Sequence, residues 1–119
     1  MKKILIVDDS LMMRHKLREI VEKEGYKVVA EASDGEEAIQ KYKMTNPDLV
    51  IMDITMPEMN GIQALLELKK IDENVKVIMV SAMGQKPMVI DAIKYGAKDF
   101  LVKPFETEKF ISSINKVIA

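Results

Sequence analysis

The sequence predicts an α/β fold, a doubly wound parallel sheet of five strands with helices on both faces. Short apolar runs alternate along the chain with longer segments in which apolar residues recur at helical spacing. This alternation is typical of parallel strands joined by right-handed helical crossovers. The runs are continuous, which indicates strands that are buried on both faces. With 119 residues, of which 48% are hydrophobic, the chain suits a single domain over residues 1–119.

The first part of the chain predicts two strand–helix units. Residues 4–7 and 28–30 are the apolar runs expected to form strands. Ser10 is a candidate N-cap for the helix between them, and Ser33 with Glu36 fits a capping box for the next helix. The inward faces of these helices are expected to carry Met13, Leu17, Ile20 and Val21 in the first and Ala38, Ile39 and Tyr42 in the second.

The central strand is predicted at residues 49–52 and ends in Asp53. Buried strands rarely end on a charge, because an unpaired ion in low dielectric is unfavourable. Pro57 and Gly61 would shape the loop that follows. A third helix is expected beyond it, with Ile62, Leu65 and Leu68 facing inward.

Two further units complete the chain. Residues 75–80 and 100–102 are predicted strands, and residues 86–95 a helix that Gly96 ends. This fourth helix carries Val89, Ile90 and Ile93, and the last helix carries Phe110, Ile111, Ile114, Val117 and Ile118.

Composition narrows the classes of function. The net charge is −1, and the absence of a long basic run argues against binding to nucleic acid or to a membrane surface. The sequence has no cysteine, which excludes thiol catalysis and fits a reducing cytoplasm. Its apolar runs are too short to span a bilayer. We therefore expect a cytoplasmic protein, with a monomer as the simplest state.

Polar side chains stand where four of the predicted strands end. Asp8 and Asp9 follow the first strand, Asp53 the third, Ser81 the fourth and Lys103 the fifth. The carboxyl ends of parallel strands share one edge of a sheet, so these residues should lie together. In the flavodoxin-like strand order 2-1-3-4-5, the first and third strands are neighbours, so that Asp9 would face Asp53.

Three carboxylates in one place require cations, since two unit charges about 4 Å apart repel by roughly 4 kcal/mol at an effective dielectric of about 20. Lys103 offers one positive charge, and Mg²⁺ favours carboxylate, water and phosphate oxygens. Asp53, the central carboxylate, is the best candidate nucleophile for a phosphoryl group, and Asp8 and Asp9 are better placed to hold metal. A serine hydroxyl such as that of Ser81 can donate to a phosphoryl oxygen.

Each of these residues also has a purely structural explanation. Asp8 and Asp9 could cap the first helix, since aspartate is a good N-cap. Ser81 could be a loop hydroxyl, Lys103 a solvated surface lysine, and Phe100 a plain core residue. The shared position at the strand ends favours a role in phosphoryl or metal chemistry for four of these residues, namely Asp8, Asp9, Ser81 and Lys103.

The motifs resemble those of the receiver domains of two-component response regulators, over the whole chain. The similarity is carried by Asp8-Asp9, by Asp53 with Pro57 and Gly61, by Ser81-Ala82 and by Lys103-Pro104-Phe105. Within that family, residues 52–61, 81–85 and 102–105 look most like single-domain chemotaxis regulators, particularly thermophilic ones.

The resemblance implies a phosphorylation-activated signalling switch. Asp53 would accept a phosphoryl group from a histidine kinase. Asp8, Asp9 and Asp53 would hold Mg²⁺, together with the main-chain carbonyl of Thr55. Lys103 would contact the phosphoryl group, and its bond to the following proline would be cis. The protein would catalyse only its own phosphorylation and dephosphorylation, so it would not be an enzyme in the usual sense.

The resemblance also implies how the signal leaves the site. Ser81 would move towards the phosphoryl group, and Phe100 would turn inward behind it. The surface of the fourth helix, fifth strand and fifth helix would then bind a target, most simply a flagellar motor switch protein, and a phosphatase would reset the system. Our candidates for this partner surface are Lys86, Val89, Tyr95 and Phe100.

The chain departs from many family members at Phe100, where Tyr or His is common, so a contact through a ring hydroxyl is absent. Thr55 and Met83 stand at positions that tune dephosphorylation in the family, which leaves the phosphoryl lifetime open.

Two other functions use the same residues. A phosphorelay intermediate would pass the phosphoryl group from Asp53 to a histidine phosphotransfer protein, contacting it through Met12, Met13 and Arg14. An aspartyl-phosphate hydrolase is disfavoured, because 119 residues leave no cap domain and Thr55 is no general acid.

Overall fold

The structure is a computed structural model that describes residues 1–82 and 84–118, and it confirms the predicted α/β architecture. Five parallel strands form one sheet in the order β2-β1-β3-β4-β5, as predicted. The elements are β1 (Lys3–Val7), α1 (Leu11–Lys23), β2 (Lys27–Ala32), α2 (Gly35–Thr45), β3 (Leu49–Met52), α3 (Gly61–Ile71), β4 (Val77–Ser81), α4 (Lys86–Lys94), β5 (Asp99–Val102) and α5 (Thr107–Ile118).

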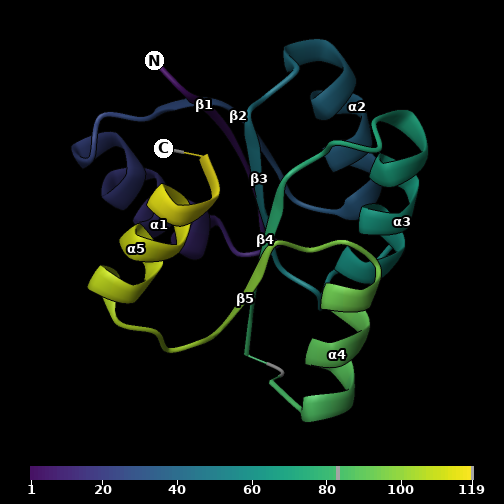
Figure 1. The fold of residues 1–119 in the computed structure, drawn as a ribbon. Helices are drawn as coiled ribbons and strands as arrows, with labels where there is room; N and C mark the ends of the chain where they lie inside the picture. The colour runs from purple at the N-terminus through teal and green to yellow at the C-terminus, as the bar shows by residue number, and fades with distance from the viewer. Residues whose placement is uncertain (83, 119) are drawn as a thin grey trace.

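Helices cover both faces of the sheet. Figure 1 shows α1 and α5 on one side and α2, α3 and α4 on the other. Successive residues of β1 point to opposite faces, so Leu5 packs in the core under α2 to α4, while Ile6 packs with Leu17 and Phe110 under α1 and α5. Every residue of β3 and β4 is buried. This double burial explains why the strands read as continuous apolar runs.

The expected capping box of the second helix is wrong by one residue. The N-cap of α2 is Asp34, whose side chain accepts a hydrogen bond from the Glu37 N–H at 2.8 Å. The Glu37 side chain in turn accepts from the N–H of Ser33 at 2.8 Å. Asp34 with Glu37 has the same spacing as Ser33 with Glu36, so the pattern alone does not separate the two registers.

The apolar residues of the fourth helix divide between two faces. Ala92 is its buried residue, and Val89 is half-buried. Ile90 and Ile93, three residues apart and therefore on one side of the helix, are 54% and 47% exposed. The sequence placed these isoleucines on the helix without indicating that they face outward.

The ends of the strands differ from expectation by one or two residues. The predicted start of the fourth strand at Val75 is wrong: Val75 is buried in a turn, where its N–H donates to the Asp72 carbonyl at 3.0 Å, and β4 begins at Val77. Within residues 1–82 and 84–118, no helix combines the length and apolar character needed to cross a membrane.

Candidate functional site

Backbone hydrogen bonds align the carboxyl ends of the strands at one edge of the sheet. The Asp8 N–H donates to the Ala32 carbonyl at the end of β2, and the Asp53 N–H donates to the Val7 carbonyl at the end of β1, each at 3.0 Å. The Lys103 N–H donates to the carbonyl of the last residue of β4 at 2.9 Å. These backbone hydrogen bonds therefore hold Asp8, Asp53 and Lys103 at the same edge of the sheet, as predicted.

Three carboxylates converge at this edge. Oxygens of Asp8, Asp9 and Asp53 all lie within 4.8 Å of one another. Asp8 is 1% exposed and Asp53 7%, whereas Asp9 is exposed. Lys103 Nζ lies 2.7 Å from Asp8 Oδ2 and 3.5 Å from Asp53 Oδ2. The predicted cluster is thus confirmed as an arrangement in space, with its solvent-facing side at Asp9.

The structural explanations for two of these groups are wrong. Ser10 is the N-cap of α1, as predicted, because its side chain accepts from the Met13 N–H at 3.2 Å. The Asp8 carboxylate instead accepts from the Ser10 N–H at 2.9 Å, so it orders the loop and does not cap the helix. The side chain of Lys103 is only 15% exposed and bridges two carboxylates, so it is not a solvated surface lysine.

Asp53 is held in an unfavourable environment for a charge. Burial raises the pKa of Asp53, and the neighbouring Asp8 raises it further, while Lys103 and the Ile54 N–H, which donates to Oδ1 at 2.7 Å, lower it. The net direction is upward, because burial is the largest of these effects. Lys103 alone therefore does not compensate the acidic cluster, and a further cation would favour its ionised form.

The raised pKa predicts that Asp53→Asn stabilises the metal-free protein. A raised carboxyl pKa stabilises the folded protein at acidic pH, and this contribution is lost as the pH rises through the folded-state pKa. At neutral pH, the ionised Asp53 carboxylate therefore lowers the free energy of unfolding. At pH 7 with a chelator present, we expect the variant to be more stable than wild type, with a higher midpoint in urea unfolding. The gain should disappear below the ordinary pKa of 3.8. A variant less stable than wild type at pH 7 would contradict a raised pKa for Asp53.

The donor set fits Mg²⁺. The cluster offers three carboxylates on an accessible edge, all of them oxygen ligands, and one lysine that leaves part of the negative charge uncompensated. Asp8, Asp9 and Asp53 would hold the ion. Thr55, two residues after Asp53, is exposed, and the role of its carbonyl as a further ligand stays a prediction.

The two predicted switch residues lie on adjacent strands behind the site. Ser81 ends β4 and is fully buried. Phe100 on β5 pairs with Met79 of β4, is half-buried, and packs against the core under α2 to α4. Its packing role is thus confirmed, and its movement stays a prediction. Met83, the other position expected to tune dephosphorylation, lies outside the described residues.

The predicted partner surface is only partly exposed. Lys86 and Tyr95 are exposed, whereas Val89 and Phe100 are half-buried. Apolar exposure on this side comes instead from residues that the sequence did not single out for it, namely Ile90, Ile93 and Val102, exposed by 54%, 47% and 45%. Apolar side chains are common on surfaces one at a time, but several on neighbouring elements mark a candidate contact face.

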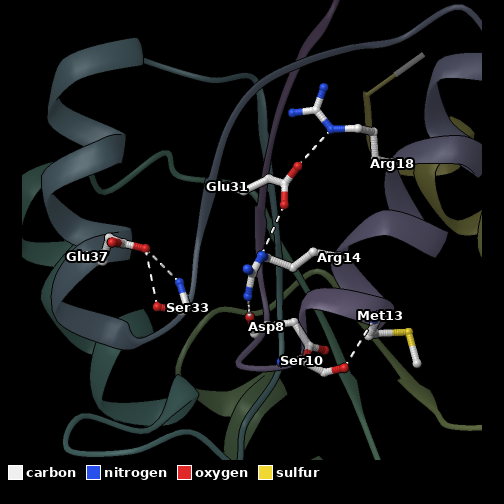
Figure 2. Close-up of polar contacts among 8 residues, drawn as sticks. All are labelled: Asp8, Ser10, Met13, Arg14, Arg18, Glu31, Ser33 and Glu37. Atoms are coloured by element: carbon white, nitrogen blue, oxygen red, sulfur yellow. Dashed lines mark hydrogen bonds and ion pairs between the residues drawn. The ribbon is translucent and has the colours of Figure 1, made fainter.

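One set of contacts next to the cluster was not anticipated from the sequence (Figure 2). Arg14 on α1 donates from Nη1 to the main-chain carbonyl of Asp8 at 2.7 Å and from Nε to Glu31 Oε1 at 3.0 Å. Arg18 donates from Nε to the other oxygen of Glu31 at 2.7 Å. The arginines are spaced i, i+4 on one helix face, which was a readable signal, but their shared partner on β2 was not.

Comparison with known proteins identifies the family. The family model described as response regulator receiver domain matches residues 4–115. The chain is 58% identical over 116 residues to chemotaxis protein CheY of Thermotoga maritima and 57% identical to that of Bacillus subtilis, covering 98% of this chain and 97% of each relative. The structure of a CheX–CheY–BeF₃–Mg²⁺ complex from Borrelia burgdorferi superimposes with a TM-score of 0.94 at 42% identity, covering 98% of this chain and 88% of that one.

The fold, the strand-end cluster and these similarities agree. The chain belongs to the family of response regulator receiver domains, which act in the phosphorylation-dependent signalling of two-component systems.

Proposed function

We propose that the protein is a phosphorylation-activated switch whose acceptor is Asp53 and whose phosphoryl donor is a histidine kinase of the chemotaxis type. The observation that carries the proposal is the position of Asp53, a buried carboxylate at the end of β3 within 4.8 Å of two other carboxylates and 3.5 Å from Lys103. A structural aspartate would not require such a concentration of charge.

The chain's own residues suit an in-line transfer. The Ile54 N–H holds one oxygen of Asp53 at 2.7 Å, which orients the other for attack on phosphorus. The new bond joins that oxygen to phosphorus as the bond from phosphorus to the kinase histidine breaks. Lys103 then turns from the carboxylates to the phosphoryl oxygens. When bound by Asp8, Asp9 and Asp53, Mg²⁺ supplies positive charge that offsets the charge on those oxygens.

The output would be a change in the α4–β5–α5 surface that exposes or reshapes a binding site. Ser81 would donate to the phosphoryl group, and Phe100 would move into the space behind it. Shifting such a two-state balance from 1:99 to 99:1 requires about 5.5 kcal/mol of differential stabilisation. The exposed Ile90, Ile93 and Val102 offer apolar contacts on this surface.

The target that we favour is a flagellar motor switch protein, with a phosphatase to end the signal. Support comes from the relatives described as chemotaxis proteins and from the similar Borrelia burgdorferi protein bound to CheX. We further propose that the protein acts in the cytoplasm as a monomer and catalyses only its own phosphorylation and dephosphorylation.

The test of this function is phosphorylation-dependent binding. Wild-type protein treated with a chemotaxis-type kinase, ATP and Mg²⁺ should bind the motor switch protein at least about tenfold more tightly than untreated protein, an increment of about 1.4 kcal/mol in calorimetric titration. The matched control is the same mixture without kinase. Equal affinities with and without phosphorylation would contradict the switch.

Ser81→Ala should separate phosphorylation from output. Removing the hydroxyl leaves Asp53, Lys103 and the metal carboxylates in place, so the variant should still acquire a phosphoryl group. It would lack the hydrogen bond that draws β4 towards the site, worth about 1.5–3 kcal/mol when the partner is charged. We expect most of the phosphorylation-induced gain in target affinity to be lost. A phosphorylated variant that binds like wild type would contradict this role of Ser81.

A phosphorelay intermediate is the second candidate. Its support is the apolar first turn of α1, where Leu11 and Met12 are 70% and 81% exposed shortly after Asp9. Of the contacts expected for it, Met12 is available, but Met13 and Arg14 are half-buried. Rapid transfer from the phosphorylated protein to a histidine phosphotransfer protein, with no affinity for the motor switch, would favour this function.

A further inference from the structure

We propose that Arg14 is a positioning residue for Mg²⁺ binding: it fixes the peptide that joins Asp8 to Asp9, and so sets the distance between their carboxylates. The inference rests on the proposed function, because it assumes that these carboxylates hold Mg²⁺. The inference gives α1 and β2 a part in the metal site, although neither element carries one of the three clustered carboxylates.

The contact that carries the inference is a hydrogen bond to the loop backbone. Arg14 Nη1 donates to the Asp8 carbonyl at 2.7 Å, a short distance for such a bond. That carbonyl belongs to the Asp8–Asp9 peptide, so the bond fixes the orientation of the peptide plane. Asp9 is exposed, and the position of its carboxylate therefore depends on this backbone more than on surrounding side chains.

Other bonds fix the rest of Asp8 and leave this peptide as the adjustable part. The Asp8 N–H donates to the Ala32 carbonyl at 3.0 Å, and Asp8 Oδ1 accepts from the Ser10 N–H at 2.9 Å. Lys103 holds Oδ2 at 2.7 Å. Among the residues that the structure describes, Arg14 makes the one hydrogen bond to the carbonyl of the Asp8–Asp9 peptide.

Arg14 is itself held in place. Its side chain is 15% exposed, and Nε donates to Glu31 Oε1 at 3.0 Å, while Arg18 binds Oε2 at 2.7 Å. Glu31 lies on β2, opposite Ile6 of β1, so the anchor belongs to the rigid sheet. Figure 2 shows the chain of contacts from Arg18 through Glu31 and Arg14 to the Asp8 backbone.

A positional role and a purely electrostatic role of Arg14 predict opposite effects of its removal on the affinity for Mg²⁺. A cation near three carboxylates competes with Mg²⁺, so its removal would strengthen metal binding if charge alone mattered. If Arg14 positions the loop, its removal weakens binding, because the ligands lose their arrangement. Loss of such supporting contacts in metal sites typically lowers affinity by about 10–100-fold.

The experiment measures the Mg²⁺ dissociation constant by calorimetry for wild type, Arg14→Gln and Arg18→Gln. Arg18 is the matched control, because it binds the same Glu31 by a hydrogen bond of similar length. Within residues 1–82 and 84–118, Arg18 contacts Glu31 and Glu22 and makes no hydrogen bond to the Asp8–Asp9 loop. We expect Arg14→Gln to bind about tenfold more weakly and Arg18→Gln to remain within about twofold of wild type. Unchanged or tighter binding by Arg14→Gln would overturn the inference, as would equal weakening in both variants.

A second variant covers the case in which Arg14→Gln does not fold. Arg14→Lys keeps the charge, but one ammonium does not reproduce the planar fork that reaches both Glu31 and the Asp8 carbonyl, so we expect binding about threefold weaker or more. Wild-type affinity in Arg14→Lys would overturn the inference.

The Mg²⁺ dependence of phosphorylation gives an independent readout. In Arg14→Gln, the Mg²⁺ concentration for half-maximal phosphorylation by acetyl phosphate should rise about tenfold, while the rate at saturating Mg²⁺ stays near that of wild type. A variant that is merely destabilised would lose both together. If wild type binds no Mg²⁺, the proposed function fails; if wild type binds it and Arg14→Gln binds equally well, only the present inference fails.

Discussion

Asp53→Asn is expected to gain no phosphoryl group from acetyl phosphate and Mg²⁺, whereas the wild-type protein gains one. The carboxylate of Asp53 is the only one of the three that is both buried and central at the end of β3, and an amide in its place is a far weaker nucleophile. Intact-protein mass spectrometry at short and long incubation times measures the difference directly.

Two controls make that result specific. Asp91→Asn changes an exposed carboxylate on α4 and should be phosphorylated like wild type. Wild type with a chelator should lose the modification, because Asp8 and Asp9 then hold no cation to offset the charge on the incoming group. A gain of mass in Asp53→Asn would place the acceptor elsewhere, and a wild type that is never modified would leave the cluster as a metal or structural site.

The fold was predictable because its signals are strong and repeated. Continuous apolar runs mark strands that are covered on both faces, and the helices between them follow a different period. The site followed from the fold, since parallel strands bring Asp8, Asp53, Ser81 and Lys103 to one edge although the chain separates them widely. The resemblance to receiver domains and the cis bond between Lys103 and Pro104 agree with that arrangement.

The features that escaped prediction depend on geometry that a one-dimensional pattern does not contain. Ser33 and Asp34 are both good N-caps with a glutamate three residues later, so only the backbone shows that Asp34 is used. The outward face of α4 depends on how the helix is rotated against the sheet. Arg14 binds the Asp8 carbonyl directly, while Glu31 on a third element holds the arginine side chain in place. Residue types alone do not reveal such an arrangement.

Gly61→Ala is expected to destabilise the protein by about 3 kcal/mol or more, a large fraction of a typical domain's stability. Gly61 is the first residue of α3 and lies against the loop that follows Asp53. A Cβ added there would stand 2.1 Å from the Asp53 carbonyl oxygen and 2.8 Å from Ile54 Cα. Both atoms are backbone, so no side-chain rotation relieves the overlap.

The close approach of α3 to the Asp53 loop explains why Gly61→Ala should also affect phosphorylation at Asp53. The Gly61 N–H donates to the Ile54 carbonyl at 2.8 Å, so α3 and the Asp53 loop are joined at this point. Separating them to admit a methyl group would displace the backbone that carries the Asp53 carboxylate and the Ile54 N–H that orients it. If Gly61→Ala folds, it should therefore also be phosphorylated more slowly than wild type at saturating Mg²⁺.

Gly25→Ala is the matched control for stability. Gly25 has a φ of +89° but nothing within 4 Å of its added Cβ, so alanine there meets backbone strain without a steric overlap. We expect a loss of about 1–2 kcal/mol, measured as the shift in the urea midpoint at constant slope. If Gly61→Ala is no less stable than Gly25→Ala, the close approach of α3 to the Asp53 loop is not a constraint on the fold. If Gly61→Ala is much less stable than Gly25→Ala, glycine is required at position 61 because the Asp53 loop and the start of α3 leave no space for a side chain.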